Sequence, residues 1–367
     1  MDTLVERFAQ TVLTYSLDIR KGDILLVRTS PLAADLLTEI YRLALEAGAF
    51  VCHELSFDGQ AAVYYAHAHP EQLDWVAPWE LLQAQRVTAR LTINAPYNTR
   101  EVAGCNAEKL SRRARALSEL GRLTRQRAAA GELRWCSTLY PTHALAQEAG
   151  LALTEYRDFV FQAMFLTERD PIAAWRAFSE RQQMIADRLA NVRTLRIVAQ
   201  DTDLQLSVAE RTWINSDGRR NFPSGEVFTG PVEDTAEGYI RFSYPAIVNG
   251  REVEDVRLWF EQGRVVQAEA GKGKEYLDEM LGTDPGARYL GEVAIGNNYN
   301  ITRFTRNTLF DEKIGGTCHL ALGASYPDTG GKNESAIHWD MVCDLRQGGE
   351  IYGDGELLHK NGQWIAS

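Results

Sequence analysis

The sequence predicts an α/β protein with two domains. The first is an N-terminal three-layer α/β domain with a parallel-type sheet, and the second is a C-terminal α+β domain with a mostly antiparallel, barrel-like sheet. At 367 residues the chain is too long for one ordinary hydrophobic core. Strands alternate with helices in the first half, whereas short alternating strands prevail after Val192. We therefore expect domains at residues 1–191 and 192–367.

Apolar runs and amphipathic segments follow one another through the first domain, which is typical of a parallel sheet covered by helices. Strands are expected at residues 23–28, 50–55, 90–94 and 133–136. Helices are expected at residues 32–47, 110–130 and 168–191. An amphipathic first helix is expected from the spacing of Leu4, Phe8, Val12 and Tyr15.

The second domain has a different pattern. Short runs of alternating apolar residues predict strands at residues 195–198, 204–208, 239–244, 253–260 and 265–269. One helix is expected at residues 274–281. Short strands that follow one another in this way favour antiparallel pairing.

Charge and hydropathy argue against two classes of partner. The formal net charge is −11, and Arg112, Arg113 and Arg115 lie at helical spacing among leucines, which indicates a solvated helix face rather than a phosphate-binding groove. No segment approaches the roughly 20 apolar residues that span a bilayer. We therefore expect neither a nucleic acid nor a membrane as a partner.

The cysteines predict a reducing compartment. They are Cys52, Cys105, Cys136, Cys318 and Cys343. An odd number without CxxC spacing argues against both a disulfide framework and a zinc knuckle. Apolar neighbours flank each cysteine, so we expect buried free thiols. Since no secretory signal is apparent at the N-terminus, we expect a cytoplasmic location.

His338 and Asp340 mark a candidate metal site in a strand-forming run near the C-terminus. Side chains on a strand alternate faces, so these two point the same way, while Trp339 points to the opposite face and is expected to pack in the core. An imidazole and a carboxylate side by side make half of a divalent-metal site. Further donor residues precede them closely: Glu312, His319, Tyr326 and Glu334.

Glu226 and Glu292 add two carboxylates, in segments punctuated by glycine and proline that are expected to be loops. Taken singly, either is most simply a surface carboxylate. His319 alone is most simply a core histidine, and Tyr326 alone an ordinary packing residue. Their clustering favours a site, and carboxylate oxygens with imidazole nitrogens suit Zn²⁺, Co²⁺ or Mn²⁺. Three carboxylates and two histidines exceed the needs of one tetrahedral ion, so two ions are expected.

Five short motifs follow one another through the second domain. They are Gly225–Pro231, Gly291–Val293, Gly316–Gly323, Ser325–Pro327 and Asn333–Asp340. In this order they resemble the thermophilic aminopeptidase family of metallopeptidases, also called the M29 or aminopeptidase T/aminopeptidase S family. The resemblance covers essentially the whole C-terminal half, and the N-terminal half agrees in general layout.

The resemblance implies an enzyme that binds two divalent ions and releases N-terminal amino acids from peptides with a free N-terminus. The metal ligands it implies are Glu226, Glu292, His319, Tyr326, His338 and Asp340. The catalytic residues it implies are Glu226, Glu292, Glu312 and Tyr326, where Glu312 is the nearest match to an acidic residue that precedes the first histidine of the family. The resemblance also implies a homodimer.

The expected chemistry follows from paired ions. Two ions about 3.5–4 Å apart can lower the pKa of a shared water to roughly 7. Glu292 is expected to span both ions, and Glu226 or Glu312 to move the proton of this water to the leaving amine. Such an enzyme would be a metallo-aminopeptidase.

Two other classes of protein stay open. His319, His338 and Asp340 alone match the two-histidine, one-carboxylate iron site of a mononuclear ring-cleaving dioxygenase, which is known on the same fold. That interpretation leaves Glu226 and Glu292 without a metal. A non-catalytic binding module is the third class, although a decayed site would be expected to have lost ligands.

Overall fold

The computed structural model describes residues 3–248 and 250–366, and the chain in it divides into two compact units. The first unit ends at Ala173 and also contains Gly218–Phe222. The second consists of Ala174–Asp217 and of the chain from Pro223 onward. This division lies near the start of helix α10, whereas the boundary expected at residue 192 lies after it.

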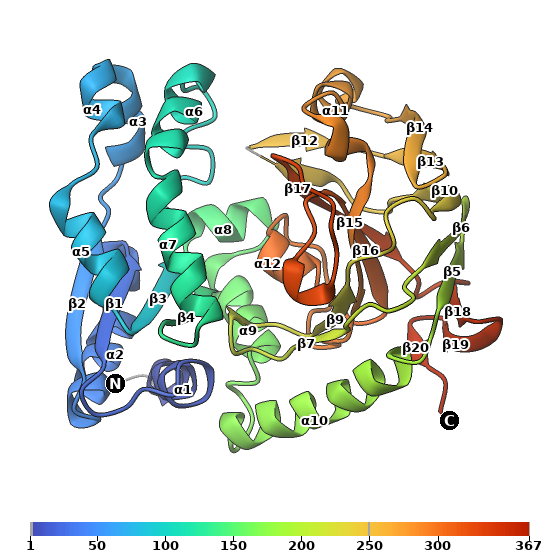
Figure 1. Cartoon of the computed structure of the whole chain (residues 1–367). Coiled ribbons are helices and arrows are strands. Elements are labelled where there is room, and N and C mark those ends of the chain that lie inside the picture. Colours follow the sequence, from blue (N-terminus) through green and yellow to red (C-terminus); the bar gives the residue numbers. More distant parts are fainter. Residues whose placement is uncertain (1–2, 249, 367) are drawn as a thin grey trace. The chain divides into compact units, whose positions relative to one another are not determined.

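The first unit contains the predicted parallel sheet (Figure 1). Its strand order is β2-β1-β3-β4-β8, and every neighbouring pair is parallel. The strands are β1 (Ile24–Thr29), β2 (Phe50–Leu55), β3 (Ala89–Asn94), β4 (Arg134–Leu139) and β8 (Asn221–Phe222). The first four lie where apolar runs predicted them, so the parallel sheet is confirmed.

Helices precede, connect and follow these strands, and the last of them, α10, lies mostly in the second unit. They are α1 (Thr3–Thr11), α2 (Ala34–Glu46), α3 (Gln60–His67), α4 (Pro70–Asp74), α5 (Pro78–Arg86), α6 (Ala107–Ala116), α7 (Ser118–Ala129), α8 (His143–Glu148), α9 (Leu153–Ala163) and α10 (Pro171–Leu189). The single helix predicted at residues 110–130 is wrong: the chain turns at Leu117, whose ψ of −3° departs from the helical value and separates α6 from α7.

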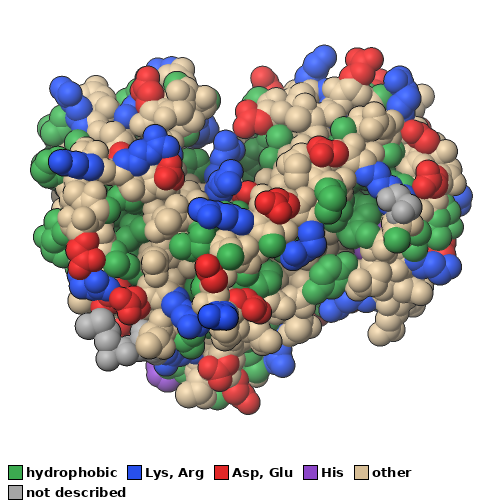
Figure 2. All heavy atoms as spheres, turned by 90° about the horizontal axis from the view of Figure 1, so that it is seen from below, with side chains coloured by type: hydrophobic (Ala, Val, Ile, Leu, Met, Phe, Trp, Pro, Cys, Tyr) green, Lys and Arg blue, Asp and Glu red, His purple; other side chains and the backbone are tan. Residues whose placement is uncertain are grey.

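The arginines of α6 and α7 lie among acidic partners. Arg112 pairs with Asp74 at 2.5 Å, and Arg113 pairs with Glu80 at 3.4 Å. Figure 2 shows the same mixture of basic and acidic side chains across one face of the chain. Paired arginines of this kind support a solvated helix face rather than a phosphate-binding groove.

The second unit contains two larger antiparallel sheets and one small hairpin. One sheet has the order β14-β13-β10-β6-β5-β18-β19-β20, and the other has the order β17-β16-β15-β9-β7. The strands of the first are β5 (Thr194–Ala199), β6 (Thr202–Ser207), β10 (Glu237–Arg241), β13 (Arg257–Glu261), β14 (Arg264–Glu269), β18 (Glu350–Gly353), β19 (Glu356–Lys360) and β20 (Gln363–Trp364). Those of the second are β7 (Ile214–Ser216), β9 (Glu226–Thr229), β15 (Leu290–Gly296), β16 (Thr317–Gly323) and β17 (His338–Asp344).

The hairpin corrects one prediction. Residues 253–260 were expected to form one strand, but they contribute to both β12 (Arg251–Val253) and β13, and β12 pairs with β11 (Ala246–Val248). Asp255 lies between them with a φ of +52°, a left-handed conformation that a regular strand does not contain. Helix α11 (Lys274–Leu281) agrees with its prediction, and α12 (Thr308–Asp311) was not predicted.

One apolar core joins both sheets of the second unit. It includes Leu195, Ile197, Leu204 and Ile240 from one sheet and Val227, Val293, Ile295, Cys318, Leu320, Leu322, Trp339, Met341 and Cys343 from the other. These residues of β9, β15, β16 and β17 alternate with the candidate metal ligands along each strand. Trp339 therefore packs in the core, as predicted. None of the helices in the described ranges combines the length and the apolar character that crossing a bilayer requires.

All five cysteines are free thiols, as predicted, but the expectation that all of them are buried is wrong for two. Cys136, Cys318 and Cys343 are buried, whereas Cys105 is half-buried and Cys52 is exposed. Cys52 lies on β2, which forms an edge of the parallel sheet and has no fully buried residue. Apolar neighbours in the sequence therefore did not indicate burial at this edge.

His359 on β19 is a fully buried histidine whose two ring nitrogens form no hydrogen bond of normal geometry with any described residue. Its ring packs edge-on against Trp364, with the ring centres 5.3 Å apart. Burial lowers the pKa of His359 to about 4. The folded protein therefore keeps this imidazole neutral at pH values where an unfolded chain would protonate it.

We expect His359→Leu to reduce the acid sensitivity of folding. The pKa is about 6.5 in the unfolded chain and about 4 in the folded one, so the unfolded state binds the proton first as the pH falls from 6.5 to 4. In wild type this one histidine would remove up to about 3 kcal/mol of stability across that window. Urea unfolding from pH 7.5 to 4.5 should give a flatter profile for the variant. The exposed His67→Gln is the control, and equal slopes for wild type and His359→Leu would contradict this assignment.

Candidate metal centre

The register of sheet β17-β16-β15-β9-β7 gathers the candidate ligands on one face. Ala321 on β16 pairs with Glu292 on β15 at one side and with Asp340 on β17 at the other. Directly paired residues of adjacent strands point to the same face, so Glu292 and Asp340 flank the small side chain of Ala321. His319 lies two residues before Ala321 and therefore points the same way.

The remaining two strand ligands follow from the same register. His338 pairs with Gly323 on β16, and Glu226 pairs with Gly296 on β15. Glu226 and Glu292 were expected in loops, which is wrong, because both lie within paired strands. Their glycine neighbours permit close backbone approach rather than a turn.

Two glycines show why this approach matters. A Cβ on Gly296 would lie 2.2 Å from the carbonyl oxygen of Ile314, and one on Gly323 would lie 2.2 Å from that of Ile337. A side chain at either position would displace the neighbouring backbone. Gly296 thus allows the segment after α12 to lie against the sheet, and Gly323 does the same for the segment before His338.

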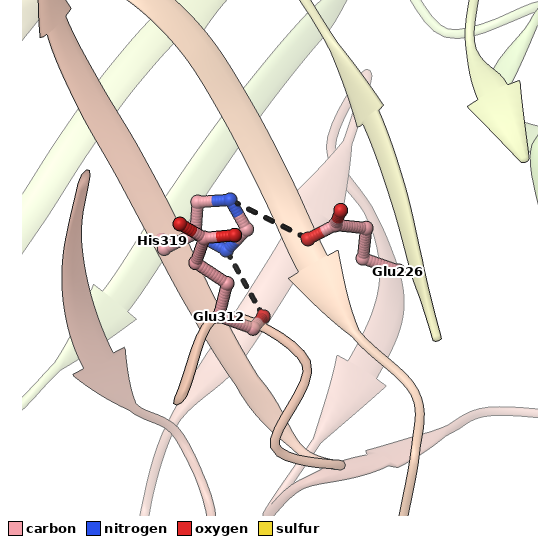
Figure 3. A group of neighbouring side chains, drawn as sticks. All are labelled: Glu226, Glu312 and His319. Carbon is pink, nitrogen blue, oxygen red and sulfur yellow. Dashed lines mark hydrogen bonds and ion pairs between the residues drawn. The ribbon is translucent and has the colours of Figure 1, made fainter. Parts of the chain in front are cut away.

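The segment after α12 brings Glu312 to the site. Asp311 at the end of α12 accepts hydrogen bonds from the amide and hydroxyl of Thr305, at 2.7 and 3.0 Å. The Glu312 carbonyl oxygen lies 3.1 Å from His319 Nδ1. Figure 3 shows the Glu312 carboxylate beside the His319 ring, and Glu226 directed at the same ring from its own strand.

The donors form two groups in the described part of the chain. One contains Glu226, Glu312 and His319, and the other contains Glu292, His338 and Asp340. In each group, one donor atom from every residue lies within 4.8 Å of the others. The structure therefore brings together five of the six sequence-predicted ligands and also Glu312.

Glu292 lies between the two groups. Its Oε1 is 3.4 Å from His319 Nε2, and its Oε2 is 3.2 Å from His338 Nε2. One carboxylate that faces a histidine of each group has the arrangement of a bridging ligand. The two groups are thus parts of one continuous centre.

Both histidines direct their Nε2 atoms into this centre. Nδ1 of His319 lies 3.1 Å from the Glu312 carbonyl, and Nδ1 of His338 lies 2.7 Å from the Ala324 carbonyl. A carbonyl can only accept a hydrogen bond, so each Nδ1 is the protonated nitrogen. The lone pair of each neutral imidazole is then on Nε2, which is how metal-binding histidines are commonly oriented.

The carboxylate oxygens of the centre fit a bound cation. Glu226 Oε2 and Asp340 Oδ1 are buried, and neither accepts a hydrogen bond of normal geometry from any described residue. Each faces a histidine Nε2, at 3.6 Å for Glu226 and 3.4 Å for Asp340. A buried carboxylate oxygen without a donor is costly, and a metal ion would satisfy it.

The pKa values of the carboxylates separate the two groups. Burial raises the pKa of Glu226 and that of Glu312 above the ordinary range. Burial acts in the same direction on Glu292 and Asp340, but the close histidines outweigh it: His319 and His338 lower the pKa of Glu292, and chiefly His338 lowers that of Asp340. Glu226 and Glu312 are therefore better suited to take up a proton than Glu292 and Asp340.

The carboxylates of the centre also change the pKa values of His319 and His338. Burial alone lowers the pKa of His319 and of His338, but Glu292 and the neighbouring carboxylates outweigh it. The net result raises the pKa of His319 to about 9 and that of His338 to about 11. A metal ion would have to displace these protons, so its binding releases protons and tightens as the pH rises.

Lys313 is a residue of this centre that sequence reasoning missed. It is 1% exposed, and its Nζ pairs with Glu312 and lies 3.4 Å from Glu226 Oε1. Burial alone would lower the pKa of Lys313, but these two carboxylates raise it above the ordinary value. In the sequence, a lysine after Asp311-Glu312 is typical of a solvated surface, so no signal indicated its burial.

Tyr326 and Glu334 differ from the other predicted donors. The Tyr326 ring packs edge-on against His338, with ring centres 5.0 Å apart, and against Phe228 at 5.5 Å. Although nearly half exposed, its hydroxyl has a raised pKa because of partial burial and the charges of Glu292 and Asp340. Glu334 is exposed and belongs to neither donor group.

The dioxygenase alternative requires His319, His338 and Asp340 to act as one triad. In the described residues, His319 groups with Glu226 and Glu312, while His338 groups with Asp340 and Glu292. The carboxylates that this alternative left without a metal are therefore integral to both donor groups. The geometry gives the alternative no support.

Comparisons with known proteins identify the family of the chain. The family described as thermophilic metalloprotease (M29) matches residues 1–364. Aminopeptidase 2 of Geobacillus stearothermophilus is 29% identical over 98% of this chain and 97% of its own length. Aminopeptidase T of Thermus thermophilus is 28% identical over 98% of both chains.

A solved structure extends the similarity to the fold. Wild-type AmpT from Thermus thermophilus superimposes with a TM-score of 0.86 at 26% sequence identity, over 99% of both chains. The match thus includes the parallel sheet of the first unit as well as the ligand-bearing sheet of the second. Because the family match extends over nearly the entire sequence, the chain belongs to the thermophilic metalloprotease (M29) family.

Proposed function

We propose that the chain is a metal-dependent aminopeptidase that releases N-terminal amino acids from peptides and uses two divalent ions. The observation that carries this proposal is the position of Glu292, whose two carboxylate oxygens face His319 and His338 in different donor groups. The relatives named aminopeptidases support the choice of substrate. Zn²⁺, Co²⁺ and Mn²⁺ suit the donor set.

The proposed ligands divide between the two ions. Glu226, Glu312 and His319 would hold one ion, and His338 with Asp340 would hold the other. Glu292 would contact both. The chemistry that such ions supply when bound is Lewis acidity, which makes a water more acidic and polarises a peptide carbonyl.

Glu312 is the candidate for proton transfer. Burial raises the pKa of Glu312 well above its ordinary range, which favours uptake of a proton by its carboxyl group. Glu312 and Asp340 also border a small cavity of about 20 Å³ that Phe304 and Val342 help to line. A proton accepted by Glu312 can then be passed to the amine that leaves when the peptide bond breaks.

Tyr326 would act beside the donor group that contains His338. Its raised pKa keeps the phenol protonated at neutral pH, so in the absence of ions it is a hydrogen-bond donor. Its ring contact with His338 places it beside the second donor group. A direct bond from its oxygen to an ion, as the family resemblance implies, stays a prediction.

A free N-terminus can be recognised at this centre in two ways. Its amine can bind an ion through the nitrogen lone pair, or its ammonium form can pair with a carboxylate of the centre. An acylated nitrogen offers neither interaction, so the centre would prefer peptides with a free N-terminus.

We further infer a homodimer that uses the first unit. Trp75 and Trp79 are 54% and 58% exposed, with ring centres 5.4 Å apart, and Phe57 is 63% exposed. Large exposed aromatic side chains commonly mark an interaction surface. The location expected from the cysteines, the cytoplasm, remains a prediction.

We expect the protein to hydrolyse leucine p-nitroanilide after reloading with Co²⁺ or Zn²⁺, and not its N-acetyl analogue. The acetyl group removes the free amine that an ion or a carboxylate of the centre would bind. Release of nitroaniline is followed by its absorbance, and a chelator should abolish it. Equal cleavage of both compounds would rule out an exopeptidase, and failure to cleave any free-amine substrate of a residue panel would rule out the proposed activity.

Glu292→Gln should reduce kcat by about 1000-fold or more, because the amide cannot supply two anionic oxygens to the centre. His338→Ala should have a similar effect. The metal content by elemental analysis should fall in both variants, while circular dichroism keeps the wild-type fold. Glu334→Gln is the matched control, since Glu334 is exposed and outside both groups, and it should retain activity. Wild-type turnover in either of the first two variants would contradict the dinuclear assignment.

For the quaternary structure, light scattering during size-exclusion chromatography should give about twice the chain mass of 41.2 kDa. The double substitution Trp75→Asp with Trp79→Asp should shift the protein to the monomer, because charges would have to be buried at the interface. Met184→Asp introduces the same charge at an exposed apolar position of α10 and should leave the dimer intact. A monomeric wild type would contradict the inference.

A further inference from the structure

Lys313 gives the two donor groups different charge environments. Its side chain is 1% exposed, and its Nζ forms ion pairs with Glu312 and with Glu226, the latter at 3.4 Å. Both carboxylates belong to the same donor group, together with His319. This group therefore contains a fixed positive charge from the protein itself.

The backbone fixes the position of Lys313. Its amide donates to the Phe310 carbonyl at 3.0 Å, and its carbonyl accepts from the Asn298 amide at 3.1 Å. The next residue, Ile314, forms a bridge with Asn298 and lies against Gly296, where no side chain could fit. The lysine thus starts from a rigid segment and has few alternative positions for its ammonium group.

The other donor group has no such lysine. In the described part of the chain, the ion pairs of Glu292 and Asp340 are with His319 and His338. Both histidines are candidate metal ligands themselves, whereas the ammonium of Lys313 occupies carboxylate oxygens of Glu226 and Glu312. The lysine would therefore lie beside an ion bound by the group of Glu226 and Glu312.

We propose that Lys313 makes the two metal positions unequal: the group of Glu292, His338 and Asp340 binds the first ion tightly, and the group of Glu226, Glu312 and His319 binds a second ion weakly. The second ion must share Glu226 and Glu312 with the ammonium and lies near a like charge, which opposes binding in a buried site. This inference rests on the proposed two-ion function, and it assigns Lys313 the role of setting the affinity for the second ion.

The test is a metal titration of the full-length protein. Metal-free wild type and Lys313→Met are titrated with Zn²⁺ or Co²⁺ at one pH by calorimetry, with competition against a chelating dye for tight sites. Wild type should bind two ions with dissociation constants that differ by about 100-fold or more. In Lys313→Met the second ion should bind at least about tenfold tighter, while the first changes by less than about threefold.

Two controls separate charge from general damage. Lys272→Met removes an ion pair with Glu254 at an exposed position of the same unit and should leave both dissociation constants unchanged. A purely structural role for Lys313 would weaken both metal positions in the Met variant rather than tighten one. If metal-free Lys313→Met does not fold, the protein is purified with metal and dialysed against metal buffers, and its metal content by elemental analysis gives the same affinities.

The outcomes separate this inference from the proposed function. Two ions bound by wild type, with the second unchanged or weakened in Lys313→Met, would overturn the role of Lys313 and leave the two-ion enzyme standing. A single ion in both proteins at every metal concentration would overturn the two-ion centre itself. Two unequal ions in wild type and a tighter second ion in the variant would support both.

Discussion

Buried negative charge on one face of a single sheet is the constraint on which the rest of the structure depends. Glu226, Glu292 and Asp340 come from three strands, and Glu312 approaches from outside the sheet. Carboxylates at such distances cannot all be ionised in a low-dielectric interior without nearby cations. The histidines and Lys313 supply part of this charge, and divalent ions are the natural source of the rest. The pairing register of the strands therefore determines which donor side chains meet at the centre.

The same register allows one strand to serve two purposes. On β16, the face with His319, Ala321 and Gly323 borders the ligands, while the alternate residues belong to the apolar core. Ala321 and Gly323 are small, which leaves open the space between the larger donors. A bulky residue at either position would occupy the region where the carboxylates of neighbouring strands converge. Catalytic geometry and core packing are therefore linked residue by residue along this strand.

The period-2 alternation of strands was sufficient to predict several features of this arrangement. It placed His338 and Asp340 on one face and Trp339 on the other, because this depends only on local geometry. The loop assignment of Glu226 and Glu292 failed because glycine has two uses, and here it permits close packing of backbones. The single helix predicted at residues 110–130 and the single strand predicted at residues 253–260 were wrong. In each, the backbone conformation of one residue, Leu117 or Asp255, interrupts the element although the apolar pattern continues past it. Lys313 was beyond prediction, since its burial depends on α12 and on contacts distant in sequence.

Strand β16 borders the ligands on one face and contributes to the core on the other, so metal binding is linked to the stability of the folded protein. The core cluster includes Cys318, Leu320 and Leu322, which alternate with the face that borders the ligands. Any ion that binds only the folded state adds its binding free energy to the stability of this core. In a cell short of metal, the metal-free chains would unfold more often and be degraded sooner. The abundance of the protein, and not only its activity, would then follow the concentration of free metal.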